Sequence, residues 1–311
     1  MRGTRPLVFN IGLALMTWLA WYTFAGGPAA FAILLENWQI TATMVFGSFI
    51  AGATSEGGGA VAFPVFTKAL LIPPQDAKVF SLAIQSVGMT AATLLIIVMG
   101  LKVEWRVIRW ASLAGVPGIV IGASLLAPQL PPAVIKMSFT VMVSSFAFTL
   151  FALNRGIRLC NEALPDPGRR ERRLVMLAGI LGGLMSGMVG NGIDIVTFSL
   201  MVLLFHISEK VATPTSVILM AINSLVGFAL HAFVIGGFTP QVQDYWIAAI
   251  PVVVVGAPLG ALVCSWLDRI VIARLLIGLI FIELVTSLMI IPLSAQVVLA
   301  SGMMFLLFLG L

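Results

Sequence analysis

Long apolar stretches, separated by short polar segments, run through most of the 311-residue chain. A helix of about 20 apolar residues is long enough to cross the hydrocarbon core of a bilayer. Two stretches are interrupted by glycine and polar residues, which predicts a pair of shorter helices in each, 40–53 with 59–72 and 174–188 with 193–206. The pattern predicts uninterrupted spanning helices over 7–26, 77–100, 106–127, 132–153, 211–235, 244–266, 270–292 and 295–311.

Composition places the chain in the membrane class. Hydrophobic residues make up 60% of it and charged residues 9%, and the mean hydropathy is +1.12. A soluble domain of this length could not bury so much apolar surface, so we expect an all-α polytopic membrane protein surrounded by the lipid bilayer. The net charge of +5 comes from the loops and does not indicate a nucleic-acid partner. Cys160 and Cys264 lack metal-ligand spacing and are predicted to be free thiols.

The distribution of lysine and arginine predicts the orientation. Arg2 and Arg5 place the N-terminus in the cytoplasm, and the six arginines of the loop 154–173 place that loop there too. The remaining loops also follow the rule that basic loops are cytoplasmic, provided that each interrupted helix pair enters and leaves the membrane on the same side. Residues 7–26 then form a retained anchor helix, with a cleaved signal peptide as the alternative. Basic loops 101–109 and 267–274 fall inside, loops 128–131 and 236–244 fall outside, and the predicted location is the bacterial inner membrane.

The two interrupted stretches resemble each other. GATSEGGGAVAFP (52–64) aligns with GMVGNGIDIVTFS (187–199) at an offset of 187 − 52 = 135, and PGIVIGA (117–123) matches PVVVVGA (251–257) at 134. Because the repeats start on opposite sides of the membrane, they are predicted to be inverted, with the two glycine-broken, re-entrant-like helix pairs meeting near the midplane. This architecture is typical of secondary transporters. The predicted organisation is 1–39 (N-terminal helix and connection), 40–153 (first repeat), 154–173 (basic cytoplasmic loop), 174–292 (second repeat) and 293–311 (C-terminal helix).

Glycine clusters at membrane depth suggest a binding site. Irregular backbone is tolerated there only where it lines a cavity or is buried in protein. Free N–H groups at the start of the helices after Gly59 and Gly192 could bind a small anion. The alternative is that these glycines only allow close helix packing, and that is our interpretation of three small-residue pairs elsewhere, Gly118/Gly122, Gly183/Gly187 and Gly256/Gly260.

The element ending in Gly57-Gly58-Gly59 with Pro64 beyond it, repeated once, resembles the sulfite exporter TauE/SafE family, also called the toluene-sulfonate uptake permease family. The resemblance covers roughly residues 40–290. It implies a secondary carrier of small sulfur-containing anions such as sulfite, thiosulfate or sulfoacetate, with a site at 55–59 and 190–194. The sequence departs from the family pattern at Glu56 and at 191–194, where many relatives carry a second glycine triplet.

Neutral polar residues on the helices that follow each interrupted pair are further candidates. Ser81 and Gln85 are four residues apart and share a helix face. Their hydroxyl and amide groups, like those of Ser216 and Asn223, could coordinate anion oxygens or form interhelical hydrogen bonds. The predicted substrate-binding residues are Ser55, Glu56, Gly57, Gly58, Gly59, Ser81, Gln85, Gly190, Asn191, Gly192, Asp194, Ser216 and Asn223.

Ionisable residues at membrane depth point to function. Burial disfavours the charged form of a carboxylate, so Glu56 or Asp194 could carry a proton and couple transport to proton movement. Each could instead cap a half-helix or bind Na⁺. Lys68 could supply positive charge to the anion or extend to the interface. Glu283 is interpreted as an interhelical residue and Lys78 as an interfacial one.

The favoured function is secondary active transport of sulfite or an organosulfonate such as sulfoacetate, with export as the favoured direction. A passive anion channel and a Na⁺- or H⁺-coupled carrier of another small solute stay open. The chain has no nucleophile–base pair, H-E-x-x-H motif or Walker motif, which argues against an enzyme or a primary pump. No cofactor or metal is expected, and both a monomer and a homodimer are compatible with the sequence.

Overall fold

The computed structural model describes residues 4–55, 65–153, 160–164, 168–292, 294–299 and 301–302, and these are helical apart from short connections. Within them, eight helices are long and apolar enough to span a membrane, or nine if one bent pair counts as a span. The prediction of an all-α, multi-pass membrane protein is confirmed. Seven of the eight uninterrupted spans lie within a few residues of the predicted ranges: α1 (Thr4–Phe24), α5 (Pro74–Met99), α6 (Trp105–Ile121, continued by a π-helical turn to Leu126), α7 (Pro132–Leu153), α10 (Glu209–Leu230, continued by a π-helical turn to Ile235), α11 (Pro240–Trp266) and α12 (Arg269–Ile290). The eighth prediction, 295–311, falls largely outside the described residues.

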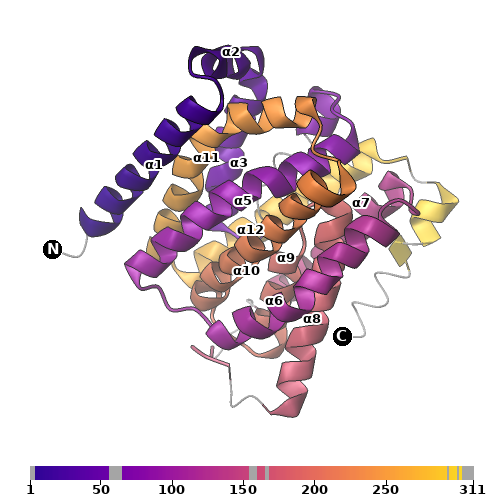
Figure 1. Cartoon of the computed structure of the whole chain (residues 1–311). Helices are drawn as coiled ribbons and strands as arrows, with labels where there is room; N and C mark the ends of the chain where they lie inside the picture. The colour runs from indigo at the N-terminus through magenta and orange to yellow at the C-terminus, as the bar shows by residue number, and fades with distance from the viewer. Residues whose placement is uncertain are drawn as a thin grey trace.

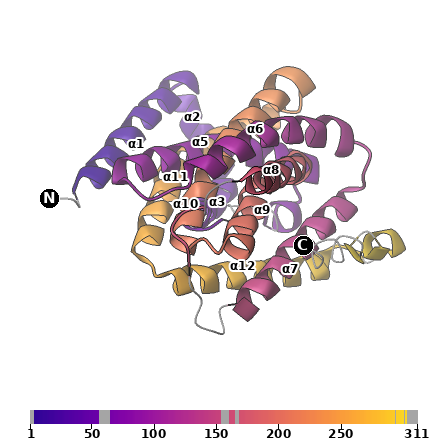
Figure 2. The same ribbon diagram turned by 90° about the horizontal axis from the view of Figure 1, so that it is seen from below.

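A short helix precedes the first broken element, where the sequence predicts only a connection. It is α2 (Pro28–Glu36), which is bent by 84° against α3 (Trp38–Ala53). Its nine residues are too few to span a bilayer, so the hydropathy pattern did not separate it from its neighbours. Gly26 and Gly27, with φ values of 86° and 64°, turn the chain out of α1. Helix α1 itself lies at the edge of the bundle, where it contacts α11 and α5 (Figure 2).

The second broken element reverses direction inside the bundle. Helix α8 (Arg169–Val189) ends at Gly190, and α9 (Ile193–Ser199) continues into a π-helical turn, η3 (Leu200–Leu204). A Cβ placed on Gly182 would lie 2.6 Å from the Cα of Ile193, so α9 begins alongside α8 and not beyond its end. The main chain of Asn161, in the segment before α8, donates to the carbonyl of His206 at 2.7 Å. The chain therefore leaves on the side where α8 began, as predicted.

The two broken elements share backbone details at an offset of 135. The first has a π-helical turn, η1 (Val65–Ala69), and adding 135 to its bounds gives those of η3. After these turns, Leu71 and His206 both adopt positive φ, at 54° and 52°. The flanking hydrogen bonds also correspond: Leu70 N to Val65 O matches Phe205 N to Leu200 O, and Ile72 N to Phe66 O matches Ile207 N to Met201 O.

Two pairs of helices pack with their backbones in close contact. Helix α6 lies along α8, and α11 lies along α3 (Figure 1). A Cβ on Gly52 of α3 would strike the carbonyl of Ala257, and one on Gly187 of α8 would lie 2.5 Å from the carbonyl of Ile119. The glycines of the three predicted small-residue pairs also meet neighbouring helices, five of them at main-chain atoms and Gly256 at the side chain of Ser48, so their interpretation as packing glycines is confirmed.

The basic loops gather at one end of the bundle. Lys102 donates to Glu162 at 2.8 Å, which holds the pKa of that carboxyl below its usual range. The buried carboxylate of Glu104 accepts from the main chain of Leu164 at 2.8 Å. Lys210 lies 3.9 Å from Asp268, at the start of α12. We call this the basic end. The opposite end of the bundle carries the connections around 72–74, 127–132 and 236–239.

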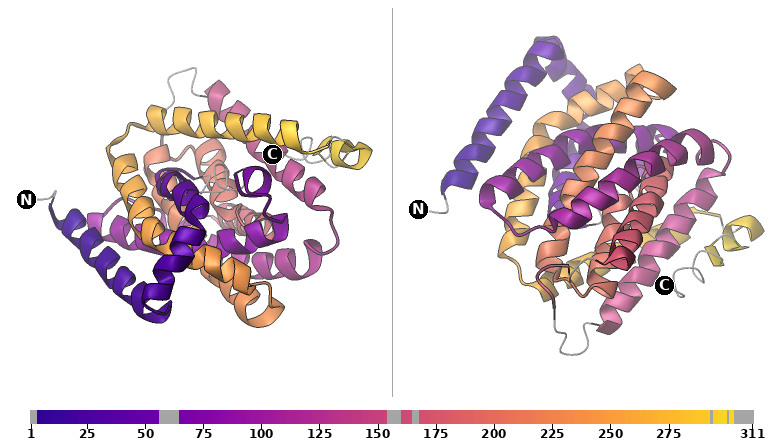
Figure 3. Two further views of the ribbon diagram at one scale, coloured as in Figure 1. Left: turned by 90° about the horizontal axis from the view of Figure 1, so that it is seen from above. Right: turned by 60° about the horizontal axis from the view of Figure 1, so that its bottom comes forward.

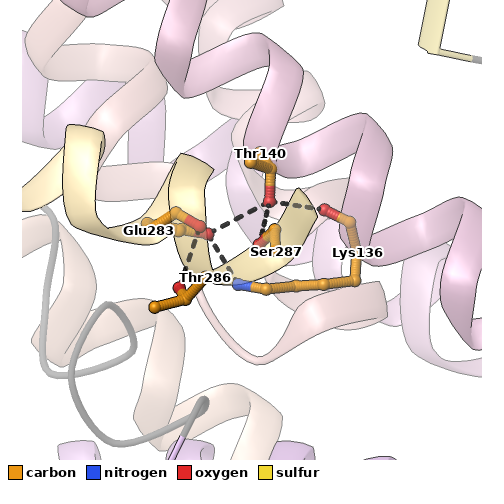
Figure 4. A network of polar contacts seen from close by, with 5 residues as sticks. All are labelled: Lys136, Thr140, Glu283, Thr286 and Ser287. Atoms are coloured by element: carbon orange, nitrogen blue, oxygen red, sulfur yellow. Dashed lines mark hydrogen bonds and ion pairs between the residues drawn. The ribbon is translucent and has the colours of Figure 1, made fainter. Parts of the chain in front are cut away.

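A buried ion pair joins α7 to α12, the helix that runs along one edge of the molecule in the left view of Figure 3. The Nζ of Lys136 lies 2.6 Å from Oε1 of Glu283, whose side chain is 0% exposed. Thr140 donates to the same oxygen at 3.4 Å and contacts the Ser287 hydroxyl at 3.0 Å, as Figure 4 shows. The interpretation of Glu283 as an interhelical residue is confirmed.

We predict that Glu283→Met will lower the free energy of unfolding by about 3–5 kcal/mol, because it leaves the Lys136 ammonium buried without a counter-charge. The double variant Lys136→Met/Glu283→Met should recover most of this loss. Thermal unfolding in detergent measures both. Glu162→Gln, which breaks an exposed pair, is the control and should leave the unfolding midpoint unchanged. A double variant no more stable than Glu283→Met would contradict this account of the pair.

We also predict that Gly183→Ala will destabilise the fold by about 1–3 kcal/mol, because its Cβ would strike the carbonyl of Gly115 on α6. Gly278→Ala on α12 is the matched control, since that position has open space around it. The control should be neutral or slightly stabilising, in line with helix propensity. Equal unfolding midpoints for the two variants would mean that α6 and α8 can separate without loss.

Candidate functional site

The carbonyl of Gly190 is the point where the second broken element meets α5. Gly190 ends α8 in the left-handed conformation, with φ of 92°, and its carbonyl cannot continue the helix. Ser81 Oγ and Gln85 Nε2 both donate to this oxygen, at 3.2 and 3.1 Å, and Gln85 Nε2 also lies 2.7 Å from Ser81 Oγ. The predicted shared face of Ser81 and Gln85 is confirmed, and it faces the second broken element.

The first N–H groups of α9 are occupied by acceptors of the protein itself. Asp194 is 1% exposed, and its Oδ1 accepts from the main chain of Gly192 at 3.2 Å and of Ile195 at 3.0 Å. The Oγ of Ser186 accepts from Ile193 N at 3.0 Å. Of the roles left open for Asp194, capping of the half-helix is the one that this geometry displays. An anion that used these N–H groups would have to compete with the Asp194 carboxylate.

Several buried polar atoms around the element have no hydrogen-bond partner among the described residues. The second oxygen of Asp194, Oδ2, is one of them. The Oε1 of Gln85 and the hydroxyl of Ser55, at the end of the first element, are others. Buried acceptors and hydroxyls without partners are costly, and they mark places where water, a proton or a ligand can bind.

The remaining candidates lie in different places. Ser216 bonds within its own helix, to the carbonyl of Thr213 at 2.8 Å. The Oδ1 of Asn223 lies against α6, 3.4 Å from a Cβ placed on Gly115, and neither polar atom of its side chain has a partner in the described chain. Asn191 is buried beside Gly190. Glu56, Gly57, Gly58 and Gly59 lie outside the described residues, as does the side chain of Lys68.

Two cavities approach the broken elements from opposite ends of the bundle. The larger, of about 270 Å³, opens at the basic end and reaches Gly52, three residues before Ser55. The smaller, of about 50 Å³, lies at the other end and reaches Met188 and Val189, beside Gly190. The larger is lined by Gly52, Ile96, Leu101, Lys102, Glu162, Ser208, Lys210, Val211, Thr213, Pro214, Ala261, Cys264 and Ser265, and the smaller by Pro74, Gln75, Lys78, Ala127, Pro132, Ile135, Lys136, Met188 and Val189.

The linings of the two cavities correspond at the repeat offset. Lys78 and Thr213 are 135 residues apart, as are Gln75 and Lys210. Lys78 was interpreted as interfacial, but its side chain is 3% exposed. Its sequence position near the start of a span suggested the interface. The alignment of Lys78 with Thr213, which lies within the predicted span 211–235, is the signal that would have indicated burial.

An all-helical bundle with eight or nine candidate spans in its described residues, and with a helix pair that turns back inside it, has the architecture of a polytopic membrane protein. The family model described as "Sulfite exporter TauE/SafE" matches residues 40–308, so the chain belongs to that family. It is a membrane transporter and not an enzyme, as predicted. No curated protein and no solved structure matched the chain.

We predict that Asp194→Leu will lower the free energy of unfolding by about 1–3 kcal/mol, because the N–H groups of Gly192 and Ile195 would lose their acceptor. Asp194→Asn keeps an oxygen in place and should stay close to the wild type. Thermal unfolding of both variants in detergent tests this. If the leucine variant unfolds at the wild-type midpoint, the capping bonds contribute nothing to stability.

Proposed function

We propose that this transporter is a secondary active carrier of sulfite or a small organosulfonate such as sulfoacetate, and that it works as an exporter of the bacterial inner membrane. Family membership supports the substrate class. The observation that carries the proposal is the pair of cavities that reach the two broken elements from opposite ends. A carrier must open its site to each side in turn, and this arrangement supplies both routes.

The two halves, 40–153 and 174–292, form an inverted repeat in this proposal. The shared π-helical turns, positive φ values and flanking bonds at an offset of 135 support it. The packing of α6 on α8 and of α11 on α3 also supports it. At the offset of 135, α6 corresponds to α11 and α3 corresponds to α8, so the two packed pairs are equivalent. Rocking of one half against the other would then close one cavity as the other opens. The basic end faces the cytoplasm, which places the N-terminus inside.

The anion is held by main-chain N–H groups and neutral polar side chains at the two broken elements. From the first element these are Ser55 to Gly59, and from the second Gly190 to Asp194, with Ser81 and Gln85 beside them. Ser216 and Asn223 contribute from α10, and Lys68 is a possible charge partner in the first element. Charge-assisted bonds from N–H groups to oxyanions are short and strong, and they suit a ligand with several acceptor oxygens.

Proton coupling at Glu56 and Asp194 is part of the proposal. A carboxylic acid is a weaker acceptor than a carboxylate, so a proton on Asp194 would loosen its hold on the N–H groups of Gly192 and Ile195. The same N–H groups would then be available to the anion. Protonation of Asp194 would thus link proton binding to substrate binding, and the capping bonds of the carboxylate would keep the element folded at other times.

One observation favours a second candidate, a Na⁺-coupled carrier. The buried Oδ2 of Asp194 has no partner among the described residues, and carboxylate oxygens are suitable ligands for a hard cation. In that case transport would require Na⁺, and a pH gradient would have no effect.

Sulfite flux in proteoliposomes tests the proposed function. Vesicles containing the purified full-length chain and loaded with sulfite should release it in a saturable way, and a pH gradient should change the rate. The conservative variants Glu56→Gln and Asp194→Asn should reduce the response to the gradient, because neither amide can carry the proton.

Each failure has its own meaning. Flux that neither saturates nor responds to gradients would identify an anion channel, and flux that requires Na⁺ would identify the second candidate. Saturable flux with full pH dependence in both variants would remove proton coupling at these residues. Proteoliposomes that move sulfoacetate but not sulfite would narrow the substrate to organosulfonates, and movement of neither would overturn the proposed substrate class.

A further inference from the structure

The smaller cavity is lined by a buried lysine that the architecture does not explain. Lys78 lies in the second turn of α5 and is 3% exposed. Among the described residues, no hydrogen bond or ion pair reaches its Nζ. An isolated buried charge is expensive, and an ionisable residue kept at membrane depth is a candidate for function.

The other cation of the cavity is already neutralised. Lys136 also lines it, but its Nζ lies 2.6 Å from the carboxylate of Glu283. Among the described lining residues, one positive charge is therefore left in excess, and it belongs to Lys78. The charge of Lys78 acts on the buried imidazole of His231, and this imidazole supplies no negative charge.

The main chain of Lys78 is fixed against the second broken element. A Cβ on Gly190 would lie 2.9 Å from the carbonyl oxygen of Lys78 and 3.3 Å from its Cα. One turn and two turns further along α5, Ser81 and Gln85 donate to the carbonyl of Gly190. The ammonium is thus carried on the same helix face as two groups that already bind this element, and any shift of the element alters its distance from the charge.

We infer that Lys78 is the counter-charge for the transported anion, and that it binds the oxyanion head group where the smaller cavity meets Gly190. The inference rests on the proposed function and goes beyond it by naming the charged residue that confers selectivity for anions. Lys78 contributes this charge from the first half only, because the repeat places the hydroxyl of Thr213 at the corresponding position of the larger cavity.

Binding of sodium sulfite to the full-length protein in detergent tests the inference. The shift of the thermal unfolding midpoint is followed against sulfite concentration at constant ionic strength, since a ligand of the folded state raises the midpoint by mass action. Lys78→Met should weaken binding by at least about tenfold, the effect of losing a hydrogen bond to a charged group. Lys78→Arg should restore most of the affinity. Arg274→Met, which removes an exposed cation outside both cavities, should bind as the wild type does.

The unfolding midpoint without sulfite separates a binding role from a structural one. Because the described chain offers Lys78 no partner, Lys78→Met should unfold at the wild-type midpoint or above it. Sulfite affinity within about twofold of the wild type, or a Lys78→Met protein that is less stable or does not fold, would overturn the inference. A wild type that responds to no sulfur anion would instead overturn the proposed function.

Discussion

Lipid provides no hydrogen-bond partners for a backbone that leaves the helical path, and this constraint governs the second broken element. Residues 190–192 interrupt the helical ladder between α8 and α9, so their carbonyl and N–H groups need partners from the protein. Ser81 and Gln85 supply them for the carbonyl of Gly190, and Asp194 and Ser186 for the N–H groups that follow. The residues that the sequence suggests as substrate ligands therefore hydrogen-bond the main chain of this turn and stabilise it. A substrate would bind to a site whose groups are already engaged with each other.

Close backbone packing decides what can move. Gly179 and Gly183 on α8 meet the backbone of α6, and Gly52 on α3 and Gly260 on α11 meet the main chain of the opposite helix. Such contacts leave little room for sliding at the contact itself. Helices α7 and α12 instead contact each other through long polar side chains. There the buried Lys136–Glu283 pair fixes one register, since a displaced helix would leave two charges unpaired.

The spans could be predicted from the sequence because a bilayer imposes a minimum length on apolar helices, and α7 begins and ends where the pattern places it. The 135-residue offset was also visible in the glycine-rich segments. Helix α2 was missed because nine residues carry no spanning signal. The i, i+4 spacing predicted that Ser81 and Gln85 share a face, but it could not identify Gly190 as their target. That contact depends on which helix lies opposite, and a single sequence does not encode this in any local pattern.

The burial of Lys78 is a second feature that the sequence alone did not predict. A lysine close to a span end usually extends its ammonium to the interface, and sequence position alone supports that interpretation. The burial of Lys78 follows instead from the segment that packs against it. Because Gly190 has no side chain, α5 approaches the second broken element closely, and the main chain of Lys78 contacts Gly190 directly. The glycine that turns the second element thus also brings the main chain of a lysine against it. In the proposed anion carrier, one close contact between Gly190 and Lys78 therefore serves two purposes. It allows the turn that interrupts the helix, and it positions the residue whose charge would attract the substrate.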